Sequence, residues 1–546
     1  MTQLSTTPKS AKANIDTLYR IFTIPENKGT TLSRIEKEIS ENINGFLKDL
    51  IVSSEISAKE IEQSFSDSKI PDEPIFVSEQ TDFLLNQVVR RSVHTSSPSF
   101  IGHMTSALPY FMLPLAKIMI ALNQNLVKME TSKAFTPLEK QAIAMLHRLV
   151  FCKSEDFYRK HAQSSQWALG GFCSCGTIAN LTALWVALNE LLKPNDRFEG
   201  VGREGIIAGA KAYGYQNLAI LISSRGHYSI AKAANLLGIG LNNTIEIPVN
   251  ENHKMDLAAL RSTIQQLEKK SVGIVAVIGI AGTTETGNVD HLEAIADICQ
   301  QHGLYFHVDA AWGGPTLFSK NHASLLKGIE RANSVTIDAH KQLYVPVGAG
   351  ICLFKSHKTL NIIEHHAKYI IRKGSRDLGR ISVEGSRPGI AMLVHSGLKI
   401  IGRKGYELLI DMGIEKAKTF AKMISHHPEF ELLTFPELNL LTYRYVPKKF
   451  SQLLQQSQAG DLSKLNQQIN RLTVSIQKEQ RENGKTFVSR TSLRVPKYGN
   501  ELITVFRTVL ANPLTTTEHL SDILEEQKSL GRKLEQTILV DDHHQR

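Results

Sequence analysis

The chain has few cysteines. Five occur among its 546 residues, at positions 152, 173, 175, 299 and 352. A small, odd number of cysteines does not make a disulfide framework, and it fits a reducing cytoplasm. Cys173 and Cys175 lack the spacing of a zinc site, and no second pair matches them. We therefore expect a cytoplasmic protein without a metal site.

Long apolar runs are also lacking. The most membrane-like stretch, residues 107–122, contains two prolines and one lysine and is short for a membrane span. Residues 1–9 lack the apolar core of a signal peptide. We expect no membrane segment, and we expect residues 107–122 to be buried under another domain or a second subunit.

A block of charge of one sign is absent as well. The net charge is +10, but the basic residues are spread along the chain and are not interleaved with aromatic residues as in a nucleic-acid-binding patch. We expect no nucleic-acid partner. The positive balance would suit an anionic cofactor and an anionic substrate, and it proves neither.

The pattern of apolar residues predicts an α/β fold. The chain is longer than one hydrophobic core supports. It starts with a loose tail and an amphipathic helix over residues 31–51, and from about residue 130 helical runs alternate with short apolar strands. This alternation is typical of a largely parallel sheet covered by helices, whose active site lies beyond the carboxyl ends of the strands. The strands are predicted at 204–209, 219–223, 244–248, 273–279, 305–309, 334–338 and 350–354.

The same pattern divides the chain into three parts. Residues 1–130 form an N-terminal extension with a helical segment for dimerisation and substrate binding. Residues 131–400 form the large domain, and residues 401–546 form a small α+β domain with strands near 438–445 and 502–507 and a closing helix.

Two successive predicted strands end in residues that carry chemistry. Asp309 ends one strand, and Lys341 follows the next strand directly behind His340. Alone, such a lysine is usually a solvated loop residue, and such an aspartate is usually a turn or helix cap. Together at this spacing they favour pyridoxal 5′-phosphate (PLP) chemistry. The lysine holds the cofactor as a Schiff base, and the carboxylate keeps the pyridine nitrogen protonated.

These two segments, residues 304–314 and 334–343, resemble the group II PLP-dependent decarboxylases, in which the lysine follows a histidine and the aspartate starts an Asp-x-Ala motif. The resemblance covers about residues 90–515. It implies the PLP-dependent transferase fold (fold type I), with a seven-stranded sheet in the large domain, and a homodimer with the cofactor near the subunit interface.

A candidate phosphate site precedes the two strands. Residues 170–180 are rich in small side chains and lead into an apolar helix. Backbone N–H groups at a helix start favour an anion. Gly176 and Thr177 are the predicted phosphate binders. By resemblance to the family, His340 also reaches the phosphate.

The resemblance also implies how the cofactor ring is held. His227 lies in a segment similar to the family's stacking-histidine motif, so it is predicted to stack on one face of the ring. Ala311, two residues after Asp309, is predicted to pack against the other face.

Two further roles come from the resemblance. In residues 282–287, Thr284 is predicted to lie near the ring hydroxyl, with Thr283 possible and a turn with capping threonines as the alternative. In residues 365–374, Tyr369 is the candidate proton donor to the substrate Cα, with a structural tyrosine as the alternative.

Two segments are predicted to bind the substrate. Residues 98–104 resemble the family's N-terminal substrate segment, which makes His103 a pocket candidate. Residues 503–513 resemble the stretch of glutamate decarboxylases whose arginine clamps a carboxylate, here Arg507. An arginine fork suits a carboxylate, and a structural ion pair is the alternative.

Over its whole length the chain most resembles the bacterial PLP-dependent aspartate 1-decarboxylases, which implies conversion of L-aspartate to β-alanine and CO2 for pantothenate synthesis. It departs from animal glutamate decarboxylases at Cys173-Ser-Cys175 and at Asp338, where asparagine is common. The alternatives are a glutamate, cysteine-sulfinate or aromatic amino-acid decarboxylase, a fold-type-I aminotransferase, and, from another class, a nucleic-acid or membrane-surface binder.

Overall fold

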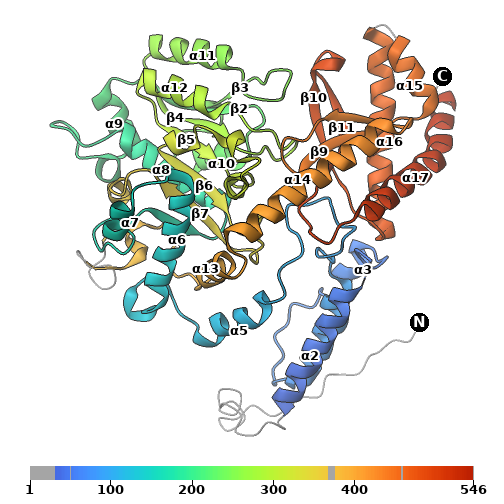
Figure 1. Cartoon of the computed structure of the whole chain (residues 1–546), viewed down its shortest axis with the longest axis horizontal. Helices are drawn as coiled ribbons and strands as arrows, with labels where there is room; N and C mark the ends of the chain where they lie inside the picture. The colour runs from blue at the N-terminus through green and yellow to red at the C-terminus, as the bar shows by residue number, and fades with distance from the viewer. Residues whose placement is uncertain (1–30, 50, 367–374, 457–458, 545–546) are drawn as a thin grey trace. The chain divides into compact units, whose positions relative to one another are not determined.

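The computed structural model describes residues 31–49, 51–366, 375–456 and 459–544 (Figure 1). By internal packing the chain forms two units. The small unit takes the described residues of Met1–His103, Tyr445–Arg490 and Leu514–Arg546, and the large unit comprises Met104–Arg444 and Thr491–Pro513. The three-part division with cuts at residues 130 and 400 stays a prediction.

A seven-stranded sheet forms the centre of the large unit (Figure 1). Its order is β1-β7-β6-β5-β4-β2-β3, and only β7 runs against the other six strands. This confirms the predicted α/β fold with a largely parallel sheet. The strands are β1 Gly170–Cys173, β2 Asn217–Ser223, β3 Thr244–Ile247, β4 Val272–Ile280, β5 Phe306–Asp309, β6 Ser334–Asp338 and β7 Gly350–Phe354.

One predicted strand is wrong. Residues 204–209 belong to helix α9, Val201–Tyr213, which contains a kink at Gly205 (φ 80°). The apolar run there is too short to distinguish a strand from a helix, and Ile207 is 88% exposed rather than buried in a sheet. The seventh strand is instead β1, a glycine-containing segment that the sequence analysis assigned to the phosphate loop.

Helices cover both faces of the sheet. Along β2, Leu221 packs into one apolar cluster with α6, α11 and α12, whereas Ile220 and Ile222 pack into another with α8 and α10. This alternation follows from the two-residue period of a strand. The helices of the large unit, besides α9, are α5 Met112–Leu122, α6 Phe135–Phe151, α7 Glu155–His161, α8 Gly176–Leu191, α10 Ser229–Leu236, α11 Leu257–Lys269, α12 Leu292–His302, α13 Ala391–Ile400 and α14 Gly402–His426.

A second, four-stranded sheet follows α14 in the chain. Its order is β10-β11-β9-β8, and β9 and β11 pair antiparallel. The two strands predicted here are confirmed as β9 and β11, and the predicted small α+β region is present. The strands β8 and β10 were missed, because neither shows a clean apolar alternation. The bounds are β8 Phe430–Thr434, β9 Leu440–Tyr445, β10 Ser489–Val495 and β11 Glu501–Val509.

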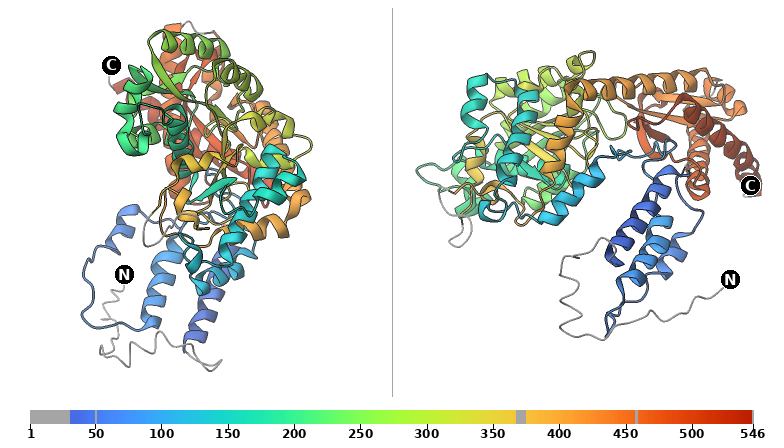
Figure 2. Two further views of the ribbon diagram at one scale, coloured as in Figure 1. Left: turned by 90° about the vertical axis from the view of Figure 1, so that its left-hand side faces the viewer. Right: turned by 60° about the horizontal axis from the view of Figure 1, so that its bottom comes forward.

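The small unit is helical. The amphipathic helix predicted near the N-terminus is confirmed as α2. The helices α16 and α17 pack against each other (Figure 2). No helix among the described residues is long and apolar enough to cross a membrane. The helices are α2 Thr31–Lys48, α3 Ala58–Gln63, α4 Val77–Phe83, α15 Lys448–Gln456, α16 Ala459–Asn483 and α17 Thr517–His544.

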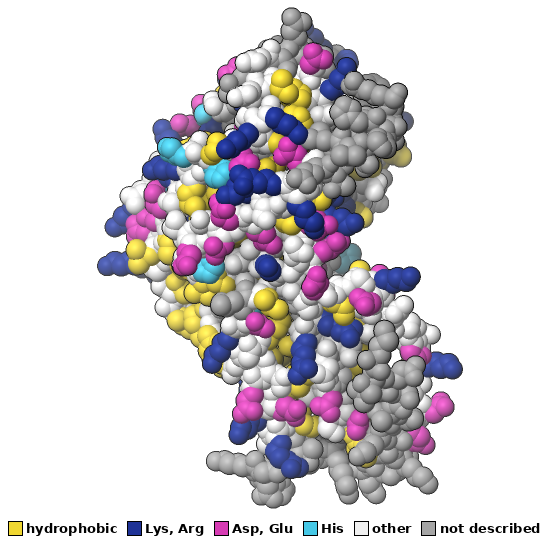
Figure 3. Space-filling view, turned by 90° about the vertical axis from the view of Figure 1, so that its right-hand side faces the viewer, with side chains coloured by type: hydrophobic (Ala, Val, Ile, Leu, Met, Phe, Trp, Pro, Cys, Tyr) yellow, Lys and Arg dark blue, Asp and Glu magenta, His cyan; other side chains and the backbone are white. Residues whose placement is uncertain are grey.

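The charges on the molecular face drawn in Figure 3 are mixed. Basic and acidic side chains lie among each other there, without a block of one sign. This distribution matches the spread of charge along the sequence.

Candidate active site

A cavity of about 190 Å³ lies in the large unit where β4, β5 and β6 end and α8 begins. This is the edge of a parallel sheet at which ligands bind. The cavity is lined by Met104, Cys175, Gly176, Thr177, Asn180, Arg225, His227, Ile280, Gly282, Thr284, Asp309, Ala311, Trp312, Asp338, His340 and Lys341. A larger cavity, of about 650 Å³, lies at the opposite ends of β4, β5 and β6 and contains none of the predicted residues.

The structure brings eight predicted residues together on the smaller cavity, namely Gly176, Thr177, His227, Thr284, Asp309, Ala311, His340 and Lys341. Thr283 is not among the lining residues; it is buried, and its hydroxyl bonds to that of Thr286 at 2.7 Å. The geometry therefore favours Thr284 over Thr283 as the residue that reaches a ligand.

Three predicted residues do not line this cavity. Arg507 lies beside it and donates from Nη1 to the carbonyl of Thr284 at 3.2 Å. His103 belongs to the small unit, although the next residue, Met104, lines the cavity. Tyr369 lies outside the described residues. The roles of all three stay predictions.

Lys341 is held by an aspartate that the sequence analysis had only noted as a departure from its relatives. The ammonium of Lys341 pairs with Asp338 Oδ2 at 2.9 Å. His340 donates from Nδ1 to the carbonyl of Ala349 at 3.0 Å, which leaves its Nε2 facing Asp338. A Cβ at Gly176 would lie 2.6 Å from Asp338 Oδ2, so only glycine fits this start of α8.

Another part of the cavity lining is built around the carboxylate of Asp309. Oδ2 accepts a hydrogen bond from the Asn180 amide at 2.9 Å, and Oδ1 accepts one from the Ala311 backbone N–H at 3.1 Å. The same amide also donates to Ser229 Oγ at 3.0 Å. Because both protons of the amide are used, the orientation of Asn180 is fixed, and its carbonyl oxygen points the other way.

That carbonyl oxygen meets a buried histidine. His307 Nε2 lies 3.1 Å from Asn180 Oδ1, and His307 Nδ1 lies 2.8 Å from Ser334 Oγ. Nε2 therefore carries the proton, and Nδ1 accepts from the serine hydroxyl. Burial lowers the pKa of His307, so the ring is neutral at pH 7. We call Asp309, Asn180, His307 and Ser334 the Asp309 wall.

Asn180 also orients His227. Ser229 Oγ accepts from Asn180 and lies 2.9 Å from His227 Nδ1, so the serine hydroxyl donates to that nitrogen. The backbone N–H of Ser229 points to the same Nδ1 at 3.3 Å. Burial lowers the pKa of His227, although Asp309 opposes this effect. His227 is therefore a neutral imidazole that keeps its proton on Nε2.

A third side of the cavity is basic. Arg225, two residues beyond the end of β2, lines the cavity and is only 8% exposed. His253 contacts Arg225, and the carboxyl group of Glu285 influences the pKa of both Arg225 and Arg507. We call Arg225, His253, Glu285 and Arg507 the Arg225 wall.

Sequence reasoning missed Asn180, His307 and Arg225. A faint signal exists for the first two. Asn180 lies four residues after Gly176, hence on the same face of α8, and His307 lies two residues before Asp309, hence on the same face of β5. Arg225 had no signal beyond its position two residues before His227.

The residues present fit PLP. Gly176 and Thr177 line the cavity at the start of α8, where backbone N–H groups favour a phosphate, and Lys341 lies on the same cavity as a carboxylate that is fixed by two hydrogen bonds. Asp338 Oδ1 is buried without a hydrogen-bond partner among the described residues, so the polar lining is incomplete without a ligand.

Comparisons with known proteins found relatives over most of the chain. The family model of the pyridoxal-dependent decarboxylase conserved domain matches residues 61–446, more than half of the chain. Aspartate 1-decarboxylase of Aliivibrio fischeri is 53% identical over 527 residues, which is 96% of each protein. L-2,4-diaminobutyrate decarboxylase of Acinetobacter baumannii is 27% identical over 414 residues, 73% of this chain and 77% of that protein.

Solved structures share the fold. The structure of Oryza sativa TDC with PLP and tryptamine matches with a TM-score of 0.78 at 19% identity, and the match covers 94% of this chain and 100% of that one. At this identity the likeness concerns the fold alone, and it agrees with the predicted PLP-dependent transferase architecture.

Proposed function

The chain belongs to the pyridoxal-dependent decarboxylase family, as its motifs predicted, and from this premise we propose that it removes the C1 carboxylate of L-aspartate to give β-alanine and CO2. The assignment of aspartate as the substrate rests on the similarity, over nearly the full length, to the aspartate 1-decarboxylase of Aliivibrio fischeri. Asp309 and Lys341 line the same cavity, which provides a site where this reaction could take place.

The cofactor is PLP, which when bound accepts the electron pair left behind as the carboxylate departs. In our proposal Lys341 holds it covalently, and Asp309 keeps the ring nitrogen protonated. Gly176, Thr177 and His340 would bind the phosphate.

His227 and Ala311 would hold the two faces of the ring, and Thr284 its hydroxyl. His227 suits this task because Ser229 fixes its Nδ1 and leaves a flat, neutral ring. Its orientation is tied to that of Asp309, since Asn180 donates to both Ser229 and Asp309. A single side chain thus aligns the group that stacks and the group that holds the ring proton.

Substrate orientation is the second task of the protein. The carboxylate that leaves must point out of the ring plane, and the side-chain carboxylate must be anchored at a distance. The Arg225 wall supplies the positive charge for that anchor. The prediction that Arg507 binds the side-chain carboxylate, that His103 lines the pocket and that Tyr369 returns a proton to Cα belongs to this proposal.

We also propose that the enzyme is a homodimer in the cytoplasm whose product feeds pantothenate synthesis. Helix α5 supports a dimer because its apolar side chains are open in the single chain, with Ile120 70% and Leu122 51% exposed. A two-fold axis would cover the same face on both copies. The five cysteines are free, as in a reducing compartment.

A substrate panel tests the proposal. The PLP-loaded enzyme is offered aspartate, glutamate, cysteine sulfinate and tyrosine, and CO2 release and product masses are measured. We expect the highest kcat/KM with aspartate and CO2 release without a keto-acid acceptor. A preference for glutamate or tyrosine would show that the substrate is wrong, and transfer of the amino group without CO2 release would place the enzyme among aminotransferases.

A further inference from the structure

We propose that Arg225 is the residue that contacts the side-chain carboxylate of the substrate. The inference rests on the proposed function, since it assumes a substrate with a second carboxylate. It adds a residue that none of the sequence motifs identified.

The position of Arg225 suits this role. It follows the end of β2, and its backbone N–H donates to Ser223 Oγ at 3.2 Å. Its side chain is 8% exposed, and it lines the same cavity as Asp309 and Lys341. A ligand held between those two residues can therefore reach the guanidinium without a rearrangement of the backbone.

The contacts of Arg225 leave its charge uncompensated. Nη2 donates to the carbonyl of Arg494 at 2.9 Å and to Nδ1 of His253 at 3.4 Å. Burial lowers the pKa of His253 to about 4, so this partner is a neutral acceptor. Arg225 Nε is buried without a partner in the described part of the chain. A buried guanidinium with only neutral partners is a site for an anion, because burial of an unpaired charge is costly.

Glu285 does not supply that anion. Within the described residues no ion pair or hydrogen bond joins it to Arg225, and its Oε2 is buried without a partner. Burial raises the pKa of Glu285, and Arg225 and Arg507 oppose this effect. The carboxyl group thus sits near both arginines without neutralising either at contact distance, and the wall keeps a net positive charge.

Arg507 does not line the cavity, whereas Arg225 does. Its Nη1 is bonded to the carbonyl of Thr284, and it is Thr284 that lines the cavity. Arg225 therefore makes the direct contact in this proposal, in place of the contact that the sequence predicted for Arg507, and Arg507 adds positive charge nearby. A guanidinium can bind a carboxylate through two parallel hydrogen bonds, which an ammonium cannot reproduce.

Succinate and butanoate test the proposal on the PLP-loaded enzyme. They differ in one terminal carboxylate, so the ratio of their affinities, measured by calorimetry, isolates the contribution of that group. Arg225→Gln should weaken succinate binding by roughly 30-fold or more, the loss expected when one partner of a buried charge pair is truncated, and should change butanoate binding by less than about threefold. Arg225→Lys should recover part of the loss.

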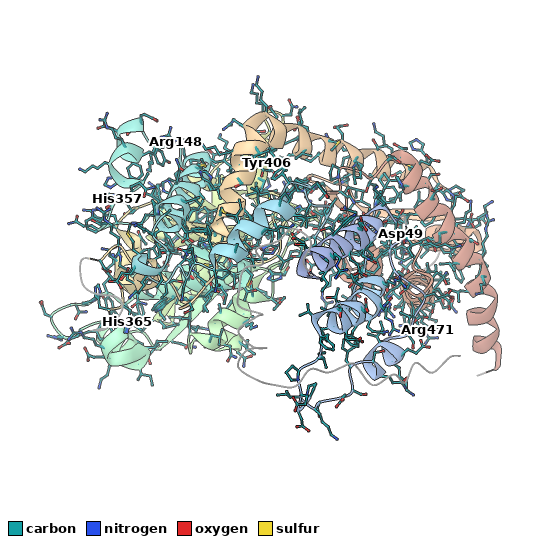
Figure 4. All side chains as sticks on the ribbon, turned by 90° about the horizontal axis from the view of Figure 1, so that it is seen from below. Asp49, Arg148, His357, His365, Tyr406 and Arg471 are labelled. Carbon is teal, nitrogen blue, oxygen red and sulfur yellow. The ribbon has the colours of Figure 1, made fainter. Side chains whose placement is uncertain are left out.

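Arg148→Gln is the matched control. Arg148 is at the edge of the large unit (Figure 4), where its half-exposed side chain pairs with Glu155 at 2.5 Å. This variant should bind both probes like the wild type. Glu285→Gln removes a negative charge from the Arg225 wall and should tighten succinate binding, an effect that a purely structural role of Arg225 does not predict.

The preference for succinate over butanoate decides the outcome. If Arg225→Gln and Arg225→Lys both keep the wild-type preference while Arg507→Gln loses it, Arg507 makes the contact and the proposal is overturned. Retained visible absorbance of the cofactor in the variants confirms that they fold. A wild-type enzyme that releases no CO2 from aspartate contradicts the proposed function, whereas the two probes still decide whether Arg225 binds a carboxylate.

Discussion

The two polar walls of the cavity differ in how their charges are paired. On the Asp309 wall every step from Asp309 through Asn180 and the neutral His307 to Ser334 is a hydrogen bond of 2.8–3.1 Å. On the Arg225 wall, within the described residues, Arg225 bonds only to neutral partners, and Arg225 Nε and Glu285 Oε2 lack partners.

In our proposal the Asp309 wall holds the cofactor, which stays bound, and the Arg225 wall holds the substrate, which binds and leaves. The side chains of a fully hydrogen-bonded wall do not have to move during the reaction. Electrostatic stabilisation of a bound cofactor requires such fixed groups. A wall with buried unpaired charge is completed by a ligand that binds and leaves.

The largest effect is expected at Lys341, which in our proposal holds the cofactor covalently. Lys341→Ala should abolish turnover and the visible absorbance of the resting enzyme, because no other lysine lines the cavity among the described residues. Absorption spectra and borohydride reduction followed by peptide mapping provide the readout. A cofactor found linked to a different lysine would contradict the role of Lys341.

Asp309→Asn tests the paired wall. The variant should retain some PLP but lose activity by on the order of 10²–10⁴-fold, since a neutral amide no longer stabilises the proton on the ring nitrogen. Steady-state kinetics of the PLP-saturated variant measures the loss, and its succinate-to-butanoate preference should stay that of the wild type. Near-normal turnover would place the partner of the ring nitrogen elsewhere.

Asn180→Ala should have a smaller effect on the same wall. It removes one hydrogen bond to a charged group and the alignment of Ser229, so kcat should fall by about 10- to 100-fold. Asn189→Ala is the control, because Asn189 is on the same helix but donates to the Trp185 carbonyl and not into the cavity. Equal kcat values for the two variants would show that the Asp309 wall does not depend on Asn180.

The smallest effect concerns pH and the Arg225 wall. Burial lowers the pKa of His253 from 6.5 to about 4, so the unfolded chain binds more protons between these values, and stability from this group falls as the pH drops from about 6.5 to 4. Asp290, whose pKa burial raises to about 6, acts in the opposite direction. His253→Gln should reduce the loss of stability between pH 7 and pH 5 by about 2 kcal/mol.

Urea unfolding at the two pH values measures this difference. The urea midpoint of His253→Gln should drop less than that of the wild type on acidification. The same drop in both proteins would mean that His253 does not enter the folded state as a neutral base.

The features predicted from the sequence are those that depend on neighbouring residues in the chain. Asp309 ends one apolar strand and Lys341 closely follows the next, which is why both were found. Six of the seven strands were placed from their short apolar runs, and all of these except the edge strand β3 are buried on both faces. Residues 204–209 and β1 show the limit of this reasoning. Residues 204–209 were predicted as a strand but belong to a helix, because a short apolar run occurs in both elements. The strand β1 was taken for a loop because it contains glycines.

The partners of these residues were not predictable in the same way. Asn180 and Asp309 are 129 positions apart, and Arg225 bonds to the backbone of Arg494 at a separation of 269 positions. Such contacts depend on how the elements pack and leave no periodic signal in the chain. The choice of Thr284 over Thr283 also needed the cavity, because both residues share one turn.

Position-labelled aspartate shows directly which carboxylate the enzyme removes. The PLP-loaded enzyme is given L-aspartate with ¹³C at C1 or at C4 in D2O, and the gas and the amino product are analysed by mass spectrometry. If the enzyme decarboxylates aspartate at C1, the C1 label leaves entirely as ¹³CO2, the C4 label stays in β-alanine, and each product molecule gains one carbon-bound deuterium. Release of the C4 label with formation of alanine, or recovery of unchanged aspartate, would contradict decarboxylation at C1.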